Sequence, residues 1–265
     1  MLYFVQMVLS LSILFLVAFA ASLLTFYTGF GLGTLLTPIF MIYFPVETAI
    51  ALTGVVHLAN NVFKLSLIGF HADRKILFQF GIPAVCFAIF GAWLLLCLPS
   101  QVPLVDYQLY GHHYSVYPLK FVISLLIALF VCMDIWPMFK NLQINRKYLP
   151  FGGMLSGFFG GLSGHQGALR SAFLIKSGLS KEAFIGTTVV ISTFVDITRL
   201  SIYGSALDLQ MLVHHKFWII SAISGAISGA FLGLKTLKKV TITLMEKIIA
   251  GLLLMYSLLM AAGFL

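Results

Sequence analysis

The chain has 265 residues, of which 60% are apolar and only 9% are charged, and its mean hydropathy is +1.05. Soluble globular proteins have about 25% charged residues, so this composition excludes a water-soluble domain, and the abundant apolar residues exclude a disordered chain. The formal net charge of +8 is typical of basic loops on the cytoplasmic side of a membrane, and we expect no nucleic-acid partner. The composition therefore predicts an all-α polytopic membrane protein.

In chain order, six apolar runs are long enough to span a bilayer, which takes about 20 residues. They cover residues 47–69, 76–98, 118–139, 182–204, 216–235 and 243–264. Two further apolar regions are interrupted: 7–44 near Gly29–Gly33 and at Pro38, and 148–178 at Gly160–Gly167. Each predicts a helix, a glycine-rich break and a short second helix that folds back. Broken backbone at membrane depth must be buried in protein or line a cavity.

The basic residues predict the topology. Eleven of the Lys and Arg residues can lie on one side of the membrane, in the loops that contain residues 74–75, 140–147, 176–181 and 235–247. Only Lys120 and Lys216 lie near the other side. This asymmetry predicts that residues 99–117, residues 205–215 and both termini are external. No basic residue precedes the first apolar run, so we expect a mature membrane helix rather than a cleaved signal peptide.

The sequence repeats itself at an offset of 135 residues. The matched pairs include Glu47 and Glu182, Thr53 and Thr188, Lys64 and Arg199, Gly69 and Gly204, and Asp73 and Asp208. Each repeat then contains a broken-helix hairpin and three transmembrane helices, and three crossings reverse the orientation of the second. We expect two inverted repeats, 1–142 and 148–265, that together form one transport domain. Inverted repeats with broken helices are typical of secondary transporters, whose substrate site lies near the midplane.

Two pairs of motifs point to a family. The breaks read GFGLGTLLTP from Gly29 to Pro38 and GGLSGHQGALRSAFL from Gly160 to Leu174. An acidic residue and a Thr-bearing helix follow each break, as ETAIALTGVVHLANN from residue 47 and EAFIGTTVVISTFVD from residue 182. Over most of residues 10–264 the chain resembles the sulfite exporter TauE/SafE family of membrane transporters. The resemblance implies transport of sulfite, organosulfonates or other small anions.

Candidate binding residues cluster at the two breaks. Glycine permits positive φ and close approach to the backbone, and helix N-termini present unpaired N–H groups to an anion. The candidates there are Gly31, Gly33, Thr34, Ser163, Gly164, His165, Gln166 and Arg170. His165 could also carry a proton, and a cation such as Arg170 inside a bilayer needs a partner, water or substrate. The alternative is that the glycines only allow tight helix packing and that Arg170 reaches the cytoplasmic interface.

Polar stripes on the helices 47–69 and 182–204 supply the remaining candidates. For substrate binding they are His57, Asn60, Asn61, Thr188 and Ser192, and for gating or a vestibule Lys64, Asp196 and Arg199. Spacings of three and four residues place each set on one helix face. We expect these faces to line a translocation path, with Lys64 and Arg199 toward opposite mouths. The alternative is hydrogen bonding between helices, with Asp196 and Arg199 paired locally.

These features predict a secondary transporter that moves a small, sulfur-containing anion across the plasma membrane, the bacterial inner membrane, by alternating access. We expect no enzyme, because P-loop, HExxH and GxSxG motifs are missing from the sequence. Two alternatives stay open: a transporter of small carboxylates, and a membrane-embedded enzyme that uses intramembrane histidines. The expected partners are the anion and the lipid bilayer, with a homodimer left open. We expect no cofactor and no metal site.

Overall fold

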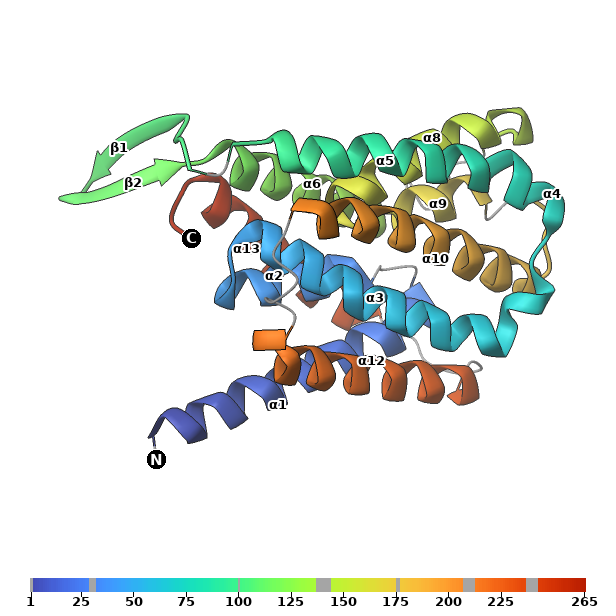
Figure 1. Ribbon diagram of the computed structural model, residues 1–265, viewed down its shortest axis with the longest axis horizontal. Coiled ribbons are helices and arrows are strands. Elements are labelled where there is room, and N and C mark those ends of the chain that lie inside the picture. The colour runs from blue at the N-terminus through green and yellow to red at the C-terminus, as the bar shows by residue number, and fades with distance from the viewer. Residues whose placement is uncertain are drawn as a thin grey trace.

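The chain folds into a bundle of helices with one β-hairpin that projects from an end of it (Figure 1). The structure, a computed structural model, describes residues 2–28, 32–99, 101–136, 144–174, 177–206, 213–236 and 243–265. Within these residues, six helices are long and apolar enough to cross a membrane. The prediction of an all-α polytopic membrane protein is confirmed.

Five of the six predicted spans correspond to helices long enough to cross a membrane. The sixth such helix is α1 (Leu2–Thr28), from the first interrupted region, whereas the described part of the predicted span 243–264 has only a shorter apolar helix, Ile249–Ala261. The helices in the described residues are α1 (Leu2–Thr28), α2 (Leu32–Tyr43), α3 (Val46–Ile68), α4 (Arg74–Ile76), α5 (Ile82–Cys97), α6 (Pro118–Ile135), α8 (Leu149–Ser163), α9 (Gly167–Leu174), α10 (Lys181–Ala206), α12 (Lys216–Thr236) and α13 (Thr243–Ala261). Two 3-10 turns, η1 (Gly69–His71) and η3 (Arg146–Tyr148), lie beside helix ends. A π-helical turn, η2 (Leu77–Gly81), joins α4 to α5.

Both interrupted regions consist of two helices with a break between them. In the second region α8 ends at Ser163 and α9 starts at Gly167. In the first region Gly29 and Gly31 lie outside the described residues. The predicted interruption at Pro38 is wrong, because α2 continues through this buried residue. A proline removes one helical hydrogen bond, and neighbouring groups in a membrane bundle can compensate for that loss.

The two broken pairs enter the bundle from opposite ends (Figure 1). The first returns to the end that carries the β-hairpin, where the ring of Phe44, just after α2, contacts His215 and Trp218. The second starts and finishes at the other end, where Arg146 donates a hydrogen bond to the backbone oxygen of Ser177. The second break, residues 164–166, lies inside the bundle, where all three residues are buried.

Glycines bring two pairs of helices into backbone contact. On α8, Gly153, Gly157 and Gly161 are four residues apart, and a Cβ on any of them would lie 1.9 to 2.2 Å from a backbone oxygen at Phe80, Ala84 or Ala88. On α12, Gly225 and Gly229 face the backbone of α1 in the same way. Small residues commonly allow such close packing in membranes. The alternative interpretation of glycine as a packing residue therefore holds for Gly161.

The segment 101–117, predicted to be external, contains a structure that the sequence did not predict. Strands β1 (Val105–Leu109) and β2 (His112–Val116) pair antiparallel. Both turn residues, Tyr110 and Gly111, have positive φ, as the tight turn of a two-residue hairpin requires. The hydroxyl of Tyr107 donates to the backbone oxygen of Ala262 at 2.5 Å, so the hairpin is tied to the end of the chain.

The glycine contacts predict a difference between two alanine substitutions. Gly157→Ala should lower the free energy of unfolding by about 1–3 kcal/mol, because overpacking forces the helices apart. Gly251→Ala is the control, since a Cβ on this helical glycine of α13 meets nothing within 4 Å. Denaturant unfolding of the purified protein in detergent measures both. Equal stability of the two variants would contradict the packing account.

The arrangement of the ends predicts opposite accessibility for two surface sites. Single cysteines at Tyr110 and Lys147, in a background without the three native cysteines, should react with a membrane-impermeant maleimide from opposite sides. Tyr110 is at the hairpin tip and is 94% exposed. Lys147 lies in η3, at the opposite end of the bundle. Labelling of intact cells and inverted vesicles measures the two sides. Reaction of both from one side would overturn the topology.

Candidate functional site

The start of α2 meets the second helix break in the interior. A Cβ on Gly33, in the first turn of α2, would lie 3.0 Å from the backbone oxygen of Gly164, which caps α8. Gly164 has a φ of 81°, a left-handed conformation that glycine adopts without strain. It also faces Arg199 of α10, whose Nη1 would lie 2.6 Å from an added Cβ. The structure thus brings Gly33 and Gly164, predicted for one site, into contact.

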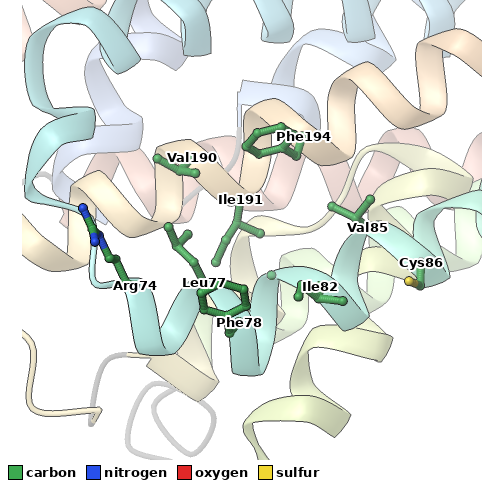
Figure 2. Close-up of a pocket in the computed structure, with 10 residues that line it drawn as sticks. Arg74, Leu77, Phe78, Ile82, Val85, Cys86, Val190, Ile191 and Phe194 are labelled. Carbon is green, nitrogen blue, oxygen red and sulfur yellow. The ribbon is translucent and has the colours of Figure 1, made fainter.

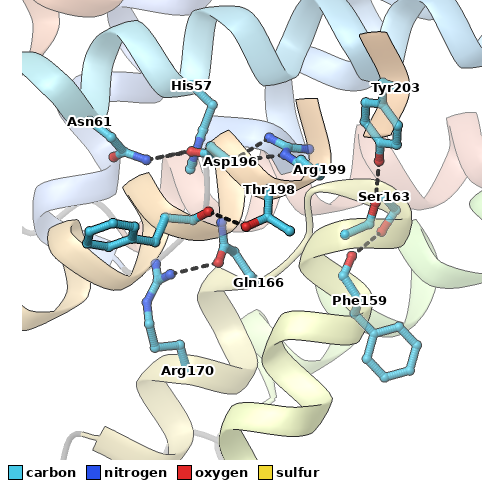
Figure 3. A network of polar contacts seen from close by, with 12 residues as sticks. His57, Asn61, Phe159, Ser163, Gln166, Arg170, Asp196, Thr198, Arg199 and Tyr203 are labelled. Carbon is cyan, nitrogen blue, oxygen red and sulfur yellow. Dashed lines mark hydrogen bonds and ion pairs between the residues drawn. The ribbon is translucent and has the colours of Figure 1, made fainter. Parts of the chain in front are cut away.

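A buried carboxylate organises the polar residues of α3 and α10 (Figure 3). Asp196 Oδ2 lies 2.5 Å from His57 Nδ1 and accepts a hydrogen bond from Asn61 Nδ2 at 2.8 Å. The other oxygen, Oδ1, accepts from Arg199 Nε at 3.0 Å, with Nη2 at 2.8 Å. Asp196 and Arg199 are both 0% exposed. Charged hydrogen bonds to both oxygens stabilise an ionised group that would otherwise be costly inside a bilayer.

One contact in this network joins matching positions of the predicted repeats. Asn61 and Asp196 are 135 residues apart in the sequence. They lie on α3 and α10, which run in opposite directions (Figure 1): a Cβ on Gly54 would lie 3.4 Å from Arg199 Cζ, while Gly186 faces the other end of α3. Equivalent residues touch where a two-fold axis passes between their elements. The Asn61–Asp196 bond is therefore consistent with inverted repeats, which stay a prediction.

Residues of the second break form another buried cluster. His165 Nδ1 lies 3.0 Å from Ser163 Oγ, and its ring stacks on Phe130 with centroids 5.7 Å apart. Arg170 Nη1 donates to Gln166 Oε1 at 3.1 Å. Arg170 is only 6% exposed, so its side chain lies in the interior rather than at a membrane interface. The break and α9 therefore hold a histidine, an amide and a guanidinium close together.

Several buried polar atoms of α2, α3, α9, α10 and the second break have no hydrogen-bond partner among the described residues. They are His165 Nε2, Gln166 Nε2, Arg170 Nε and Arg199 Nη1, and the hydroxyls of Thr37, Thr53 and Thr188. An unsatisfied buried donor costs about 1–3 kcal/mol, so a cluster of them needs an explanation such as a bound ion or water. Amide and guanidinium nitrogens can only donate. The cluster is suited to a ligand with several acceptor oxygens.

Several buried residues of this bundle carry charge. Lys64, Arg170 and Arg199 are buried cations, and Asp196 and Asp134 are buried carboxylates, of which Asp196 pairs with Arg199. Lys64 Nζ donates to the Asn60 oxygen at 3.1 Å when that amide is oriented to satisfy its neighbours. Arg170 hydrogen-bonds to the neutral amide of Gln166 and forms no salt bridge among the described residues. A cation of this kind in a low-dielectric interior favours the binding of an anion.

The other candidates lie in or beside this region. Thr34 is buried in the first turn of α2, Ser192 is buried on α10, and Thr188 is partly buried on the same helix. Gly31 lies outside the described residues. The vestibule role of Lys64 and Arg199 stays a prediction, and the structure places Arg199 deep inside, against Gly164.

Some residues of the site were missed from the sequence. Tyr203 follows Arg199 by four residues, and its hydroxyl donates to the backbone oxygen of Gly161. Its position on the polar stripe of α10 could have identified it. Ser22 hydrogen-bonds with Asn60 from α1, and Thr37 carries one of the unpartnered hydroxyls. Both stand in uniformly apolar runs, where no spacing distinguishes a site residue.

Comparison with known protein families assigns the chain to one of them. The family model of the sulfite exporter TauE/SafE matches residues 14–260. The chain belongs to this family. It is thus a membrane-embedded, multi-pass member of the TauE/SafE transporters, and membership implies transport of sulfite or related anions rather than enzymatic catalysis. Neither the curated proteins nor the solved structures contain a match.

The Asp196 network predicts non-additive effects on stability. Asp196→Asn removes the charge that Arg199 needs, so this single variant should unfold more easily than the wild type. In the double variant with Arg199→Gln, part of that loss should be recovered, with a coupling energy of about 0.5–3 kcal/mol. Denaturant unfolding of the wild type, both single variants and the double variant measures the coupling. Strictly additive losses would show that the ion pair is not energetically linked.

Proposed function

We propose that this TauE/SafE protein is a secondary transporter of a small, sulfur-containing anion, with its site where the two helix breaks meet. The observation that carries the proposal is the group of buried donors without partners on Gln166, Arg170 and Arg199. The donors come from three elements that pack together: the second break, α9 and α10. Family membership supports the same class of substrate.

The donor chemistry favours an oxyanion. A sulfur oxyanion carries several acceptor oxygens around one small centre, and guanidinium groups bind such oxygens with geometric specificity. Arg199 uses Nε and Nη2 for Asp196, and its Nη1 is directed to Gly164. Arg170 uses Nη1 for Gln166. Each guanidinium therefore has nitrogens that are bonded to the protein and one without a partner, Nη1 in Arg199 and Nε in Arg170, that is available to a substrate.

Alternating access is the mechanism that we propose for this site. Gln166, Arg170 and Arg199, which carry the free donors, are at most 6% exposed, so a substrate reaches them only after a conformational change. The glycine contacts hold α1 to α12 and α5 to α8 as two tight pairs, whereas Gly33 and Gly164 make a small contact between the broken helices. A rocking motion between the two pairs would open that contact toward one end of the bundle and then toward the other.

We further propose that the two repeats, 1–142 and 148–265, form one transport domain in the plasma membrane. The end of the bundle with Lys75, Arg146 and Lys147 would face the cytoplasm, according to the positive-inside rule. The β-hairpin end would then be external. The partners in this proposal are the small anion and the surrounding bilayer.

Anion flux into proteoliposomes tests the proposed function. Wild-type protein should transport radiolabelled sulfite, with competition by thiosulfate or organosulfonates stronger than by acetate. Arg170→Gln should lower the flux about 10- to 100-fold, because a hydrogen bond to a charged group is lost. Gly33→Val should abolish the flux completely, since the larger side chain would clash with the backbone of Gly164.

Lys147→Gln is the matched control, because it removes an exposed cation far from the breaks and should leave flux unchanged. Competition by acetate alone would favour the carboxylate alternative. Normal flux in both Arg170→Gln and Gly33→Val would show that the site lies elsewhere.

A further inference from the structure

A cavity lies away from the polar network, on the outer face of the bundle. It has a volume of about 450 Å³ and runs between α10 and the segment that joins α4, η2 and α5 (Figure 2). Its lining residues are Arg74, Leu77, Phe78, Gly81, Ile82, Val85, Cys86, Val190, Ile191 and Phe194. Apart from Arg74 the walls are apolar. We call this cavity the α5–α10 groove.

The groove opens toward the bilayer. Phe78 is 69% exposed, Ile82 52% and Phe194 55%, and these side chains lie on spanning helices of a membrane protein. Water does not fill an apolar groove at membrane depth. The molecules that surround this face are lipids, whose acyl chains match the chemistry of the walls.

Arg74 marks one end of the groove and Cys86 the other (Figure 2). The two residues are about 18 Å apart along a helix at 1.5 Å per residue. One leaflet contributes about 15 Å of hydrocarbon, half of the bilayer core. When Arg74 lies at headgroup level, the groove therefore extends over about one leaflet.

Arg74 provides the charge that selects a headgroup. It is exposed, and within the described residues its guanidinium has no hydrogen bond or ion pair with the protein. It starts α4 at the end of the bundle that also holds Lys75 and Arg146. A guanidinium at the interface binds phosphate oxygens in a bidentate manner.

The π-helical turn shapes the middle of the groove. Such turns are rare and frequently occur at functional sites. Gly81, the last residue of η2, approaches α10 closely, and a Cβ there would lie 3.3 Å from Ile191 Cγ1. Leu77 and Phe78, from the same turn, line the groove. The turn therefore combines a close helix contact with an adjacent opening.

We propose that the α5–α10 groove binds an anionic phospholipid, with an acyl chain along the apolar walls and the headgroup phosphate on Arg74. The site is independent of the proposed transport substrate. Its occupant contacts Val190, Ile191 and Phe194 of α10, the helix that also carries Asp196 and Arg199. A bound lipid would therefore support the position of α10 against α5.

Native mass spectrometry of the full chain, released from nanodiscs that contain phosphatidylcholine and phosphatidylglycerol, tests the proposal. Wild-type protein should retain one phosphatidylglycerol per chain in preference to phosphatidylcholine. Arg74→Gln should lower that preference at least about fivefold, as expected for the loss of one cation near a lipid phosphate. Lys75→Gln removes the neighbouring cation, which lines a different, polar pocket, and should keep the preference.

A second variant tests the apolar part. Val85→Trp fills the groove and should reduce retention of both lipids, while thermal unfolding verifies that the protein stays folded. Added phosphatidylglycerol should raise the unfolding temperature of the wild type more than that of Arg74→Gln. Equal effects of Arg74→Gln and Lys75→Gln would indicate only diffuse surface charge and overturn the proposal. Unchanged retention in Arg74→Gln and Val85→Trp, or a lipid-free dimer that covers the groove, would also overturn it.

Discussion

The contact between Gly33 and Gly164 constrains the rest of the bundle. A helix break leaves backbone N–H and C=O groups without helical partners, and a bilayer offers no water to satisfy them. Both breaks must therefore lie inside the protein. Glycines on α8 and α12 make this burial feasible, because they let α8 approach α5 and α12 approach α1 to backbone contact. The tight outer pairs leave the interior to two short half-helices, and the positive φ of Gly164 turns the chain between α8 and α9 within that space.

The charges around this contact divide into a structural part and a part available to a ligand. Asp196 has both oxygens engaged, by His57 and Asn61 on one side and by Arg199 on the other. That ion pair orients the guanidinium, so Nη1 is directed at the break instead of the carboxylate. Among the described residues, the guanidinium of Arg170 hydrogen-bonds to the amide of Gln166 and forms no salt bridge. This buried cation without a carboxylate partner distinguishes the network from a purely structural cluster.

Composition and spacing predicted the helices and both broken regions, because a bilayer requires long apolar segments and tolerates glycine breaks only inside protein. The same spacing placed His57 and Asn61 on one face, and the structure brings them to Asp196. Their partners could not be predicted, since a contact across helices depends on crossing geometry that one-dimensional periodicity does not contain. Pro38 shows a different limit of sequence analysis. Proline usually interrupts a helix, so a break was predicted there, but α2 continues through this residue within the packed bundle. The β-hairpin was missed because its short strands lie in a segment assigned as a loop.

Helix α10 connects the two proposed sites on this molecule. Its inward side carries Asp196 and Arg199, and its outward side lines the α5–α10 groove through Val190 and Phe194. A rigid helix cannot shift at one face without shifting at the other, so a movement of α10 that changes the distance between Arg199 and Gly164 also changes the width of the groove. Binding free energies at two such sites are reciprocal: if an anion alters the fit of a lipid, the lipid alters the affinity for the anion by the same factor. The fold thus provides a physical route by which the composition of the bilayer can act on a site that no lipid touches.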